Sequence, residues 1–140
     1  MNAYSNNYRN NQIMTASPEQ LLIMLYDGAI RFVRQAKLAI EDGRTADKAI
    51  AISKALAIIT EFSNTLDYEV GGEIALDLSQ LYDFLIRELS VVNARGDASR
   101  LDPVESVLLD LREGFVGAVE ANRSGITTSE PAVGQVVASF

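Results

Sequence analysis

Apolar side chains recur every three or four residues through four long segments of this chain, and few folds accept that spacing. A period of about 3.6 residues places them on one face of an α-helix, and no segment shows the alternation of a half-buried strand. Helices of similar length joined by short connections pack antiparallel to their neighbours. The sequence therefore predicts an all-α protein, an antiparallel up-and-down four-helix bundle. The predicted helices cover about residues 18–42, 45–66, 73–94 and 102–123.

Capping signals mark the start of the first and fourth predicted helices. Ser17 is a good N-cap, Pro18 stands at the first helical position, and Gln20 is placed to complete a capping box. At the fourth helix, Asp102 is the predicted N-cap and Glu105 the residue that closes the box. Both helices are thus expected to begin with their terminal amides satisfied by side chains.

Glycines mark the predicted ends. Gly43 ends the first helix, the "VGG" of residues 70–72 separates the second from the third, and Gly96 ends the third. Inside the fourth helix, Gly114 and Gly117 each cost about 1 kcal/mol relative to alanine. The last turns of that helix are therefore expected to be the least stable part of the bundle.

Composition divides the chain into three parts. Residues 1–16 form a polar, Asn-rich arm, residues 17–123 form the bundle, and residues 124–140 form a tail. Gly125 and Pro131 in the tail forbid a continued helix, so an irregular tail is expected.

Several classes of function are disfavoured by what the sequence lacks. It has no cysteine and no histidine, which removes thiolate and histidine chemistry. A net charge of −7 argues against nucleic-acid binding. No apolar run approaches the roughly 20 residues that cross a bilayer, and the first residues do not resemble a secretory signal. We expect a cytoplasmic protein that does not insert into membranes.

Carboxylates are the remaining candidates for acid–base or metal chemistry. They gather between residues 67 and 83, but no spacing there resembles a calcium loop, and solvated helix faces and loop polarity are the favoured explanation. The sequence predicts no enzyme, no metal and no cofactor, and an enzyme or metal protein stays the weaker alternative. The carboxylates are Asp67, Glu69, Glu73, Asp77 and Asp83.

The second and third predicted helices carry more apolar residues than one core face needs. These extra residues either widen the buried face or form an elongated groove outside the bundle. Such a groove would bind an amphipathic or extended segment of another chain, or would serve self-association. The candidate groove residues are Ile50, Ala57 and Ile58 of the second helix and Leu76, Phe84 and Val91 of the third.

Two separated stretches resemble one known family. "YRNNQIMTASPEQLLIMLYDGAIRF", residues 8–32, is similar to the N-terminal signature of the flagellar secretion chaperone FliS family. Residues 53–97 resemble its second and third helices, including the LD, GGE and L-x-x-LY landmarks. The resemblance spans about residues 8–122; the tail matches no pattern of the family, and Phe115 stands where the family often has tryptophan.

The resemblance implies a cytosolic export chaperone. Such a protein binds the disordered C-terminal region of flagellin, prevents premature polymerisation, and keeps flagellin export-competent for the flagellar type III secretion apparatus. It also implies delivery of the chaperone–cargo complex to a membrane export gate component. The alternative function is a self-associating helical-bundle adaptor that binds an amphipathic segment of another protein.

The apolar residues of the arm complete the candidate partner surface. Tyr8, Ile13 and Met14 punctuate a polar segment, and the arm is either idle, a lid over the empty groove, or a clamp on bound cargo. We expect these three residues and the six groove residues to contact flagellin.

Overall fold

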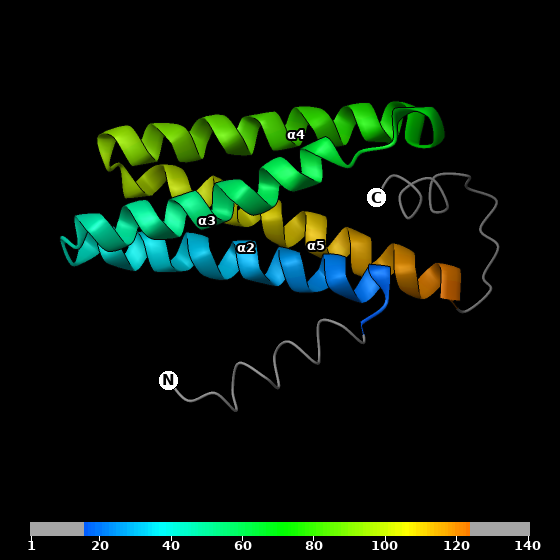
Figure 1. Cartoon of the computed structure of the whole chain (residues 1–140), viewed down its shortest axis with the longest axis horizontal. Helices are drawn as coiled ribbons and strands as arrows, with labels where there is room; N and C mark the ends of the chain where they lie inside the picture. The colour runs from blue at the N-terminus through cyan, green and yellow to red at the C-terminus, as the bar shows by residue number, and fades with distance from the viewer. Residues whose placement is uncertain (1–15, 124–140) are drawn as a thin grey trace.

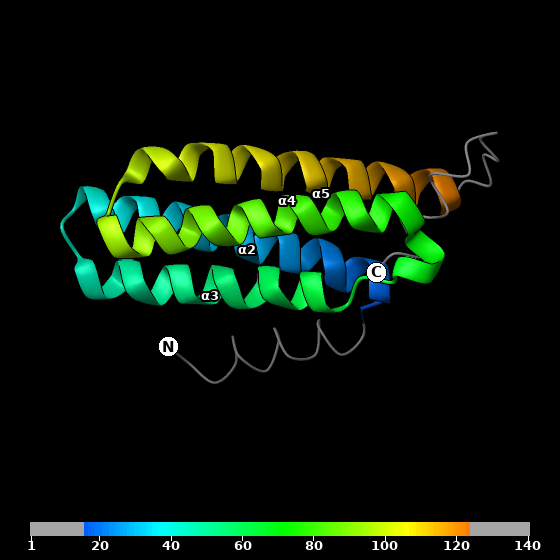
Figure 2. The same cartoon turned by 90° about the horizontal axis from the view of Figure 1, so that it is seen from above.

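The computed structural model describes residues 16–123 of the chain. Successive helices run in opposite directions along the long axis (Figure 1). Helix α2 packs against α3 and α5, and α4 packs against the same two helices, so the four form a bundle (Figure 2). The predicted fold class is confirmed. The elements are α2 (Pro18–Glu41), α3 (Thr45–Asn64), α4 (Tyr68–Arg95), the 3₁₀ turn η1 (Ala98–Arg100) and α5 (Leu101–Arg123).

The start of α2 confirms the predicted capping box. The backbone N–H of Gln20 donates to Ser17 Oγ at 3.2 Å, and the backbone N–H of Ser17 donates to Gln20 Oε1 at 3.0 Å. Pro18 takes the first helical position. A backbone N–H at this position has no acceptor within the helix, so proline loses no hydrogen bond there. The chain therefore enters the bundle at a defined point, immediately after the N-terminal arm.

Helix α4 begins earlier than the sequence predicted, but it is kinked where a break was expected. The Asp67 carboxylate accepts the N–H groups of Glu69 at 3.1 Å and Val70 at 3.0 Å, which starts a helical turn at Tyr68. Gly72 then adopts φ 52° and ψ −124°, a conformation that a side chain would strain. The first turn consequently leaves the axis of the rest of α4 (Figure 2).

The predicted start of the fourth helix is wrong. Helix α5 begins at Leu101, directly after η1, so Asp102 lies inside its first turn and is not the cap. The Asp102 carboxylate instead accepts a hydrogen bond from Lys37 Nζ at 2.7 Å, and Glu105 pairs with Arg34. Both carboxylates therefore pair with side chains of α2 and do not cap the start of their own helix.

Ion pairs make the face between α2 and α5 polar. Each pair is at least partly exposed, and such pairs contribute about 0–1 kcal/mol. They matter here mainly because they occupy the surface between these two helices. The three pairs are Asp27–Arg112, Arg34–Glu105 and Lys37–Asp102.

Each helix contributes one aromatic ring to the centre of the core. Tyr26 of α2 lies 4.6 Å from Phe62 of α3 between ring centroids and 6.2 Å from Phe115 of α5. Phe62 lies 5.7 Å from Tyr82 of α4. All four rings are buried. Phe62 and Phe115 were expected in the core, whereas the two tyrosines were not assigned to it from the sequence.

The two buried tyrosines are joined by a hydrogen bond. Their hydroxyl oxygens lie 2.9 Å apart, which links α2 to α4 across the bundle. Burial raises the pKa of Tyr26 to about 12, and the bond from Tyr82 opposes that rise. Burial also raises the pKa of Tyr82. Both side chains are therefore neutral at physiological pH, and one hydroxyl donates to the other.

A double-mutant cycle on this pair is expected to show strong coupling. Tyr26→Phe removes the bond that Tyr26 supplies to the buried hydroxyl of Tyr82, which should lower the free energy of unfolding by about 1–3 kcal/mol. Tyr26→Phe/Tyr82→Phe should cost less than the sum of the single changes, because no hydroxyl of the pair is left without its partner. Urea unfolding measures all three, and additive losses would contradict the coupling.

Two leucines predicted on the main core stripes are more than one third exposed. Leu25 of α2 is 38% exposed, although Tyr26 next to it is buried. Leu81 lies in the middle of α4, and α4 packs less extensively against α5 than the other neighbouring helices pack against each other. The assignment of these two leucines to the core was therefore wrong, because burial depends on how closely the next helix approaches as well as on helical spacing.

Candidate partner-binding surfaces

The three arm residues proposed as partner contacts, Tyr8, Ile13 and Met14, lie outside the described residues. So does the tail, residues 124–140. The other six candidates lie on α3 and α4, and the structure places each of them.

Ile50 and Ile58 lie on the side of α3 that meets α2. A Cβ atom built on Gly28 of α2 would lie 3.5 Å from Ile58 Cδ1, so Ile58 sits in the contact between the two helices and is half-buried. Ile50 is 53% exposed, more than two turns nearer the start of α3. We call the outer surface along this contact the α2–α3 face.

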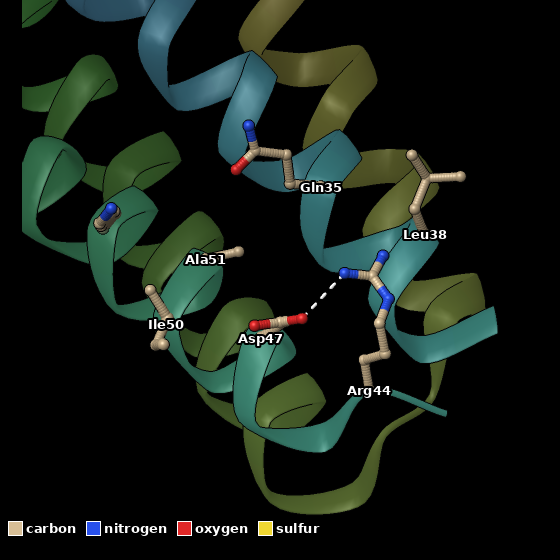
Figure 3. Close-up of a pocket in the computed structure, with 7 residues that line it drawn as sticks. Gln35, Leu38, Arg44, Asp47, Ile50 and Ala51 are labelled. Atoms are coloured by element: carbon tan, nitrogen blue, oxygen red, sulfur yellow. Dashed lines mark hydrogen bonds and ion pairs between the residues drawn. The ribbon is translucent and has the colours of Figure 1, made fainter. Parts of the chain in front are cut away.

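A pocket of about 290 Å³ opens on the α2–α3 face (Figure 3). Leu38, which is 55% exposed, and Gln35 reach it from α2, and Ile50 and Ala51 reach it from α3. At its end Arg44 Nη1 donates to Asp47 Oδ2 at 2.9 Å, and this bond raises the pKa of Arg44. The pocket is lined by Gln35, Leu38, Arg44, Asp47, Ile50, Ala51 and Lys54.

Two cations flank an aromatic ring beside this pocket. Arg31 Cζ lies 5.2 Å and Lys54 Nζ 5.4 Å from the centroid of Phe32. Both distances are within the range of cation–π attraction. Within residues 16–123, neither cation forms an ion pair with a carboxylate. The α2–α3 face therefore combines exposed aliphatic side chains with unpaired positive charge.

Phe84 and Val91 lie on α4, a helix that contributes no residue to that pocket. They share a helix face with Glu88, four residues from one and three from the other. Glu88 Oε2 accepts a bond from Arg100 Nη1 at 3.0 Å, and Arg100 leads directly into α5. Phe84 and Val91 are half-buried.

Half-buried residues of α5 complete this second surface. Glu105 and Arg112 lie on the side of α5 that pairs with α2. Val107 and Leu111 project from the other side of α5, which faces α4. No ion pair joins α4 to α5 within residues 16–123. We call this surface the α4–α5 face: Leu81, Phe84, Val91, Val107 and Leu111.

The six helical candidates therefore do not form one groove. Ile50 and Ile58 belong to the α2–α3 face, and Phe84 and Val91 to the α4–α5 face. Ala57 is exposed on α3, and Leu76 is 52% exposed on α4. Each helix has a left and a right neighbour, and sequence spacing does not say which neighbour a side chain approaches.

Sequence reasoning missed part of each face. Leu81, Val107 and Leu111 were assigned to core stripes, and Leu38 was not singled out. An apolar residue at the edge of a stripe is the only signal that the sequence carries for such positions. Whether the edge is covered depends on the spacing between helices, which is a tertiary property.

The carboxylates between residues 67 and 83 have no common site. Asp67 caps the first turn of α4. In the described part of the chain, no group of three or more acidic residues could hold a metal ion. No helix among residues 16–123 is long and apolar enough to span a bilayer.

Comparison with known proteins identifies the family. The sequence matches the family model described as "Flagellar protein FliS" over residues 1–122. The chain belongs to the FliS family. It is 44% identical to the flagellar secretion chaperone FliS of Salmonella typhimurium over 104 residues, which cover 74% of this chain and 77% of that protein. It is 33% identical to the FliS of Bacillus subtilis, with 83% and 86% covered.

A solved structure agrees with the FliS fold. The bundle is similar to a crystal structure described as a flagellar chaperone from bacteria, with a TM-score of 0.70 and 24% sequence identity. The match covers 84% of this chain and 95% of that one. Membership assigns this FliS chain to the flagellar secretion chaperones, proteins that act on a cargo. A chaperone family also favours the expectation that the chain is not an enzyme.

Proposed function

We propose that this FliS chain binds the disordered C-terminal region of flagellin in the cytosol. Binding covers apolar side chains of flagellin, prevents premature polymerisation, and keeps flagellin export-competent for the flagellar type III secretion apparatus. The complex of chaperone and cargo is then the form that meets the membrane export gate component. FliS membership and the surface of the bundle both support this proposal.

The observation that carries the proposal is the pair of apolar faces on a bundle whose core is already complete. Among residues 16–123, twenty-four apolar residues are buried, yet aliphatic side chains remain exposed or half-exposed on the α2–α3 and α4–α5 faces. An export chaperone needs such a surface to bind an apolar segment.

The energetics of binding a disordered segment favour extended contact. Ordering each cargo residue costs about 1–2 kcal/mol of backbone entropy, so a short contact is insufficient. Burial of roughly 1,500 Å² of apolar surface offers tens of kcal/mol before those costs, at about 25 cal/mol per Å². Because the two faces lie on different sides of the bundle, one cargo chain that uses both must pass around it. Ala57 and Leu76, exposed on α3 and α4, are proposed contacts on that path.

Titration calorimetry with a synthetic peptide tests the proposal. The peptide comprises the C-terminal segment, about 40 residues, of a flagellin from the same organism, and the chaperone is the full chain. We expect saturable one-to-one binding with a negative heat-capacity change, because apolar surface is buried. The proposal would be contradicted if the peptide gave no heat of binding and intact flagellin also failed to bind the chaperone.

The N-terminal arm is proposed to act on the same cargo through Tyr8, Ile13 and Met14. If the arm is a lid, deleting residues 1–14 should speed cargo association, which stopped-flow fluorescence measures. An unchanged association rate with faster dissociation would instead make the arm a clamp. Unchanged rates in both directions would remove the arm from the proposal.

A further inference from the structure

Arg31 and Lys54 of the α2–α3 face form no ion pair within residues 16–123, although Arg44 at the end of the same pocket does. The sequence has 19 acidic and 12 basic residues, so carboxylates are in excess. Arg34, Lys37, Arg44, Arg100 and Arg112 all form ion pairs. Arg31 and Lys54 instead lie against the ring of Phe32. Two positive charges thus remain available to a binding partner.

The two cations stand beside side chains that favour an apolar partner. Lys54 lines the pocket that Leu38 and Ile50 border, and within residues 16–123 these two are the most exposed of the large apolar residues, at 55% and 53%. Arg31 and Lys54 can pair with negatively charged groups, while Leu38 and Ile50 can pack against an aliphatic side chain. A segment that satisfies both has acidic residues next to aliphatic ones.

We propose that the α2–α3 face binds the part of the flagellin cargo in which Asp or Glu flanks aliphatic residues. An aliphatic side chain of that segment enters the pocket, and its carboxylates pair with Arg31 and Lys54. This inference rests on the proposed function, since flagellin is taken as the cargo. It adds a basis for selectivity, because apolar burial alone discriminates poorly between segments of similar hydrophobicity.

Charge complementarity argues for this occupant. Within a chain of net charge −7, the unpaired cations of this face attract an acidic segment, whereas an equally apolar basic segment would be repelled. The main competing occupant is a second copy of this chain, whose acidic surface offers the same chemistry. The experiment separates the two.

Matched charge reversals test the inference. Arg31→Glu and Lys54→Glu act on the α2–α3 face, and Arg112→Glu is the control: Arg112 pairs with Asp27 on the surface between α2 and α5, outside both apolar faces. All three change the net charge equally. In calorimetry with the flagellin peptide at low salt, each variant on the α2–α3 face should bind about tenfold more weakly, and the control about as tightly as the wild type.

A peptide series identifies the partner charges. Replacing Asp and Glu of the peptide by Asn and Gln, one stretch at a time, should reproduce the loss for one stretch only. That peptide should bind wild type and Lys54→Glu about equally, because the interaction has already been removed. The wild-type affinity should also fall with added salt more steeply than that of Lys54→Glu. Lys54→Gln should lie between the wild type and Lys54→Glu, and circular dichroism checks that every variant stays folded.

Each contrary result has a distinct meaning. Equal losses of affinity for Lys54→Glu and Arg112→Glu, or no loss for either variant, would overturn the inference while leaving flagellin binding intact. Failure of the wild type to bind the peptide would overturn both the inference and the proposed function. A concentration-dependent dimer of the free chain, seen by light scattering and lost in Lys54→Glu, would overturn it in favour of a second copy.

Discussion

Replacing Phe62 by alanine is expected to lower the free energy of unfolding by about 3–5 kcal/mol, the largest single effect on stability that we foresee. The Phe62 ring is 1% exposed and lies between Tyr26 and Tyr82, whose hydroxyls bond to each other. Its removal leaves a cavity between helices on opposite corners of the bundle. Thermal unfolding should shift downward by about 10–20 °C.

A second phenylalanine is the control for that change. Phe84 is half-buried at the α4–α5 face and packs against the edge of the core. Phe84→Ala removes the same atoms, but part of the space is open to water, so its cost should be clearly smaller. If denaturant unfolding gave equal losses of stability for Phe62→Ala and Phe84→Ala, the aromatic cluster would not form the centre of the core.

Replacing an exposed aliphatic residue of the proposed cargo surface by aspartate is expected to have the largest effect on binding. Ile50→Asp and Leu76→Asp should each weaken binding of the flagellin peptide by about 30- to 100-fold, because a carboxylate would lose its hydration beneath apolar cargo. Both side chains are about half exposed in the free protein, so unfolding of the uncomplexed variants should change little. Calorimetry measures affinity, and circular dichroism measures unfolding.

Leu109→Asp is the matched control. Leu109 is also an exposed aliphatic residue, but it lies on α5 between Glu105 and Arg112, which pair with α2. It is therefore outside both apolar faces, and its substitution should leave affinity unchanged. If it weakens binding as much as Ile50→Asp, the cargo surface is elsewhere. Ile58→Asp is less informative, because it would place a charge in the contact with Gly28 and destabilise the fold.

Sequence signals predicted a helix start correctly where both hydrogen-bonding partners of the cap lie close together in the sequence. The box of Ser17 and Gln20 formed as expected, because both partners lie within one turn. The cap at Asp102 did not form, because α5 already begins at Leu101, and the carboxylates of Asp102 and Glu105 instead pair with Lys37 and Arg34 of α2. A competition between a local and a distant partner is decided by the tertiary structure.

The candidate surface shows the same division. The excess of apolar residues on the second and third helices is evident from spacing alone. The structure divides these apolar residues between two faces. Ile58 contacts α2, whereas Phe84 belongs to the α4–α5 face. The pocket also needs Leu38 and Lys54, which are separated in sequence and meet only when α2 and α3 pack.

The sequence by itself determined the four helices, their antiparallel order and the family, because periodicity, caps and short connections act over a few residues and the family motifs are linear. Tertiary structure alone decided that Tyr26 and Tyr82 share a buried bond, that the α2–α5 face is closed by ion pairs, and that apolar residues remain exposed on two separate faces. The physical reason is that burial and pairing depend on the distance between helices, and no residue specifies that distance without its neighbours.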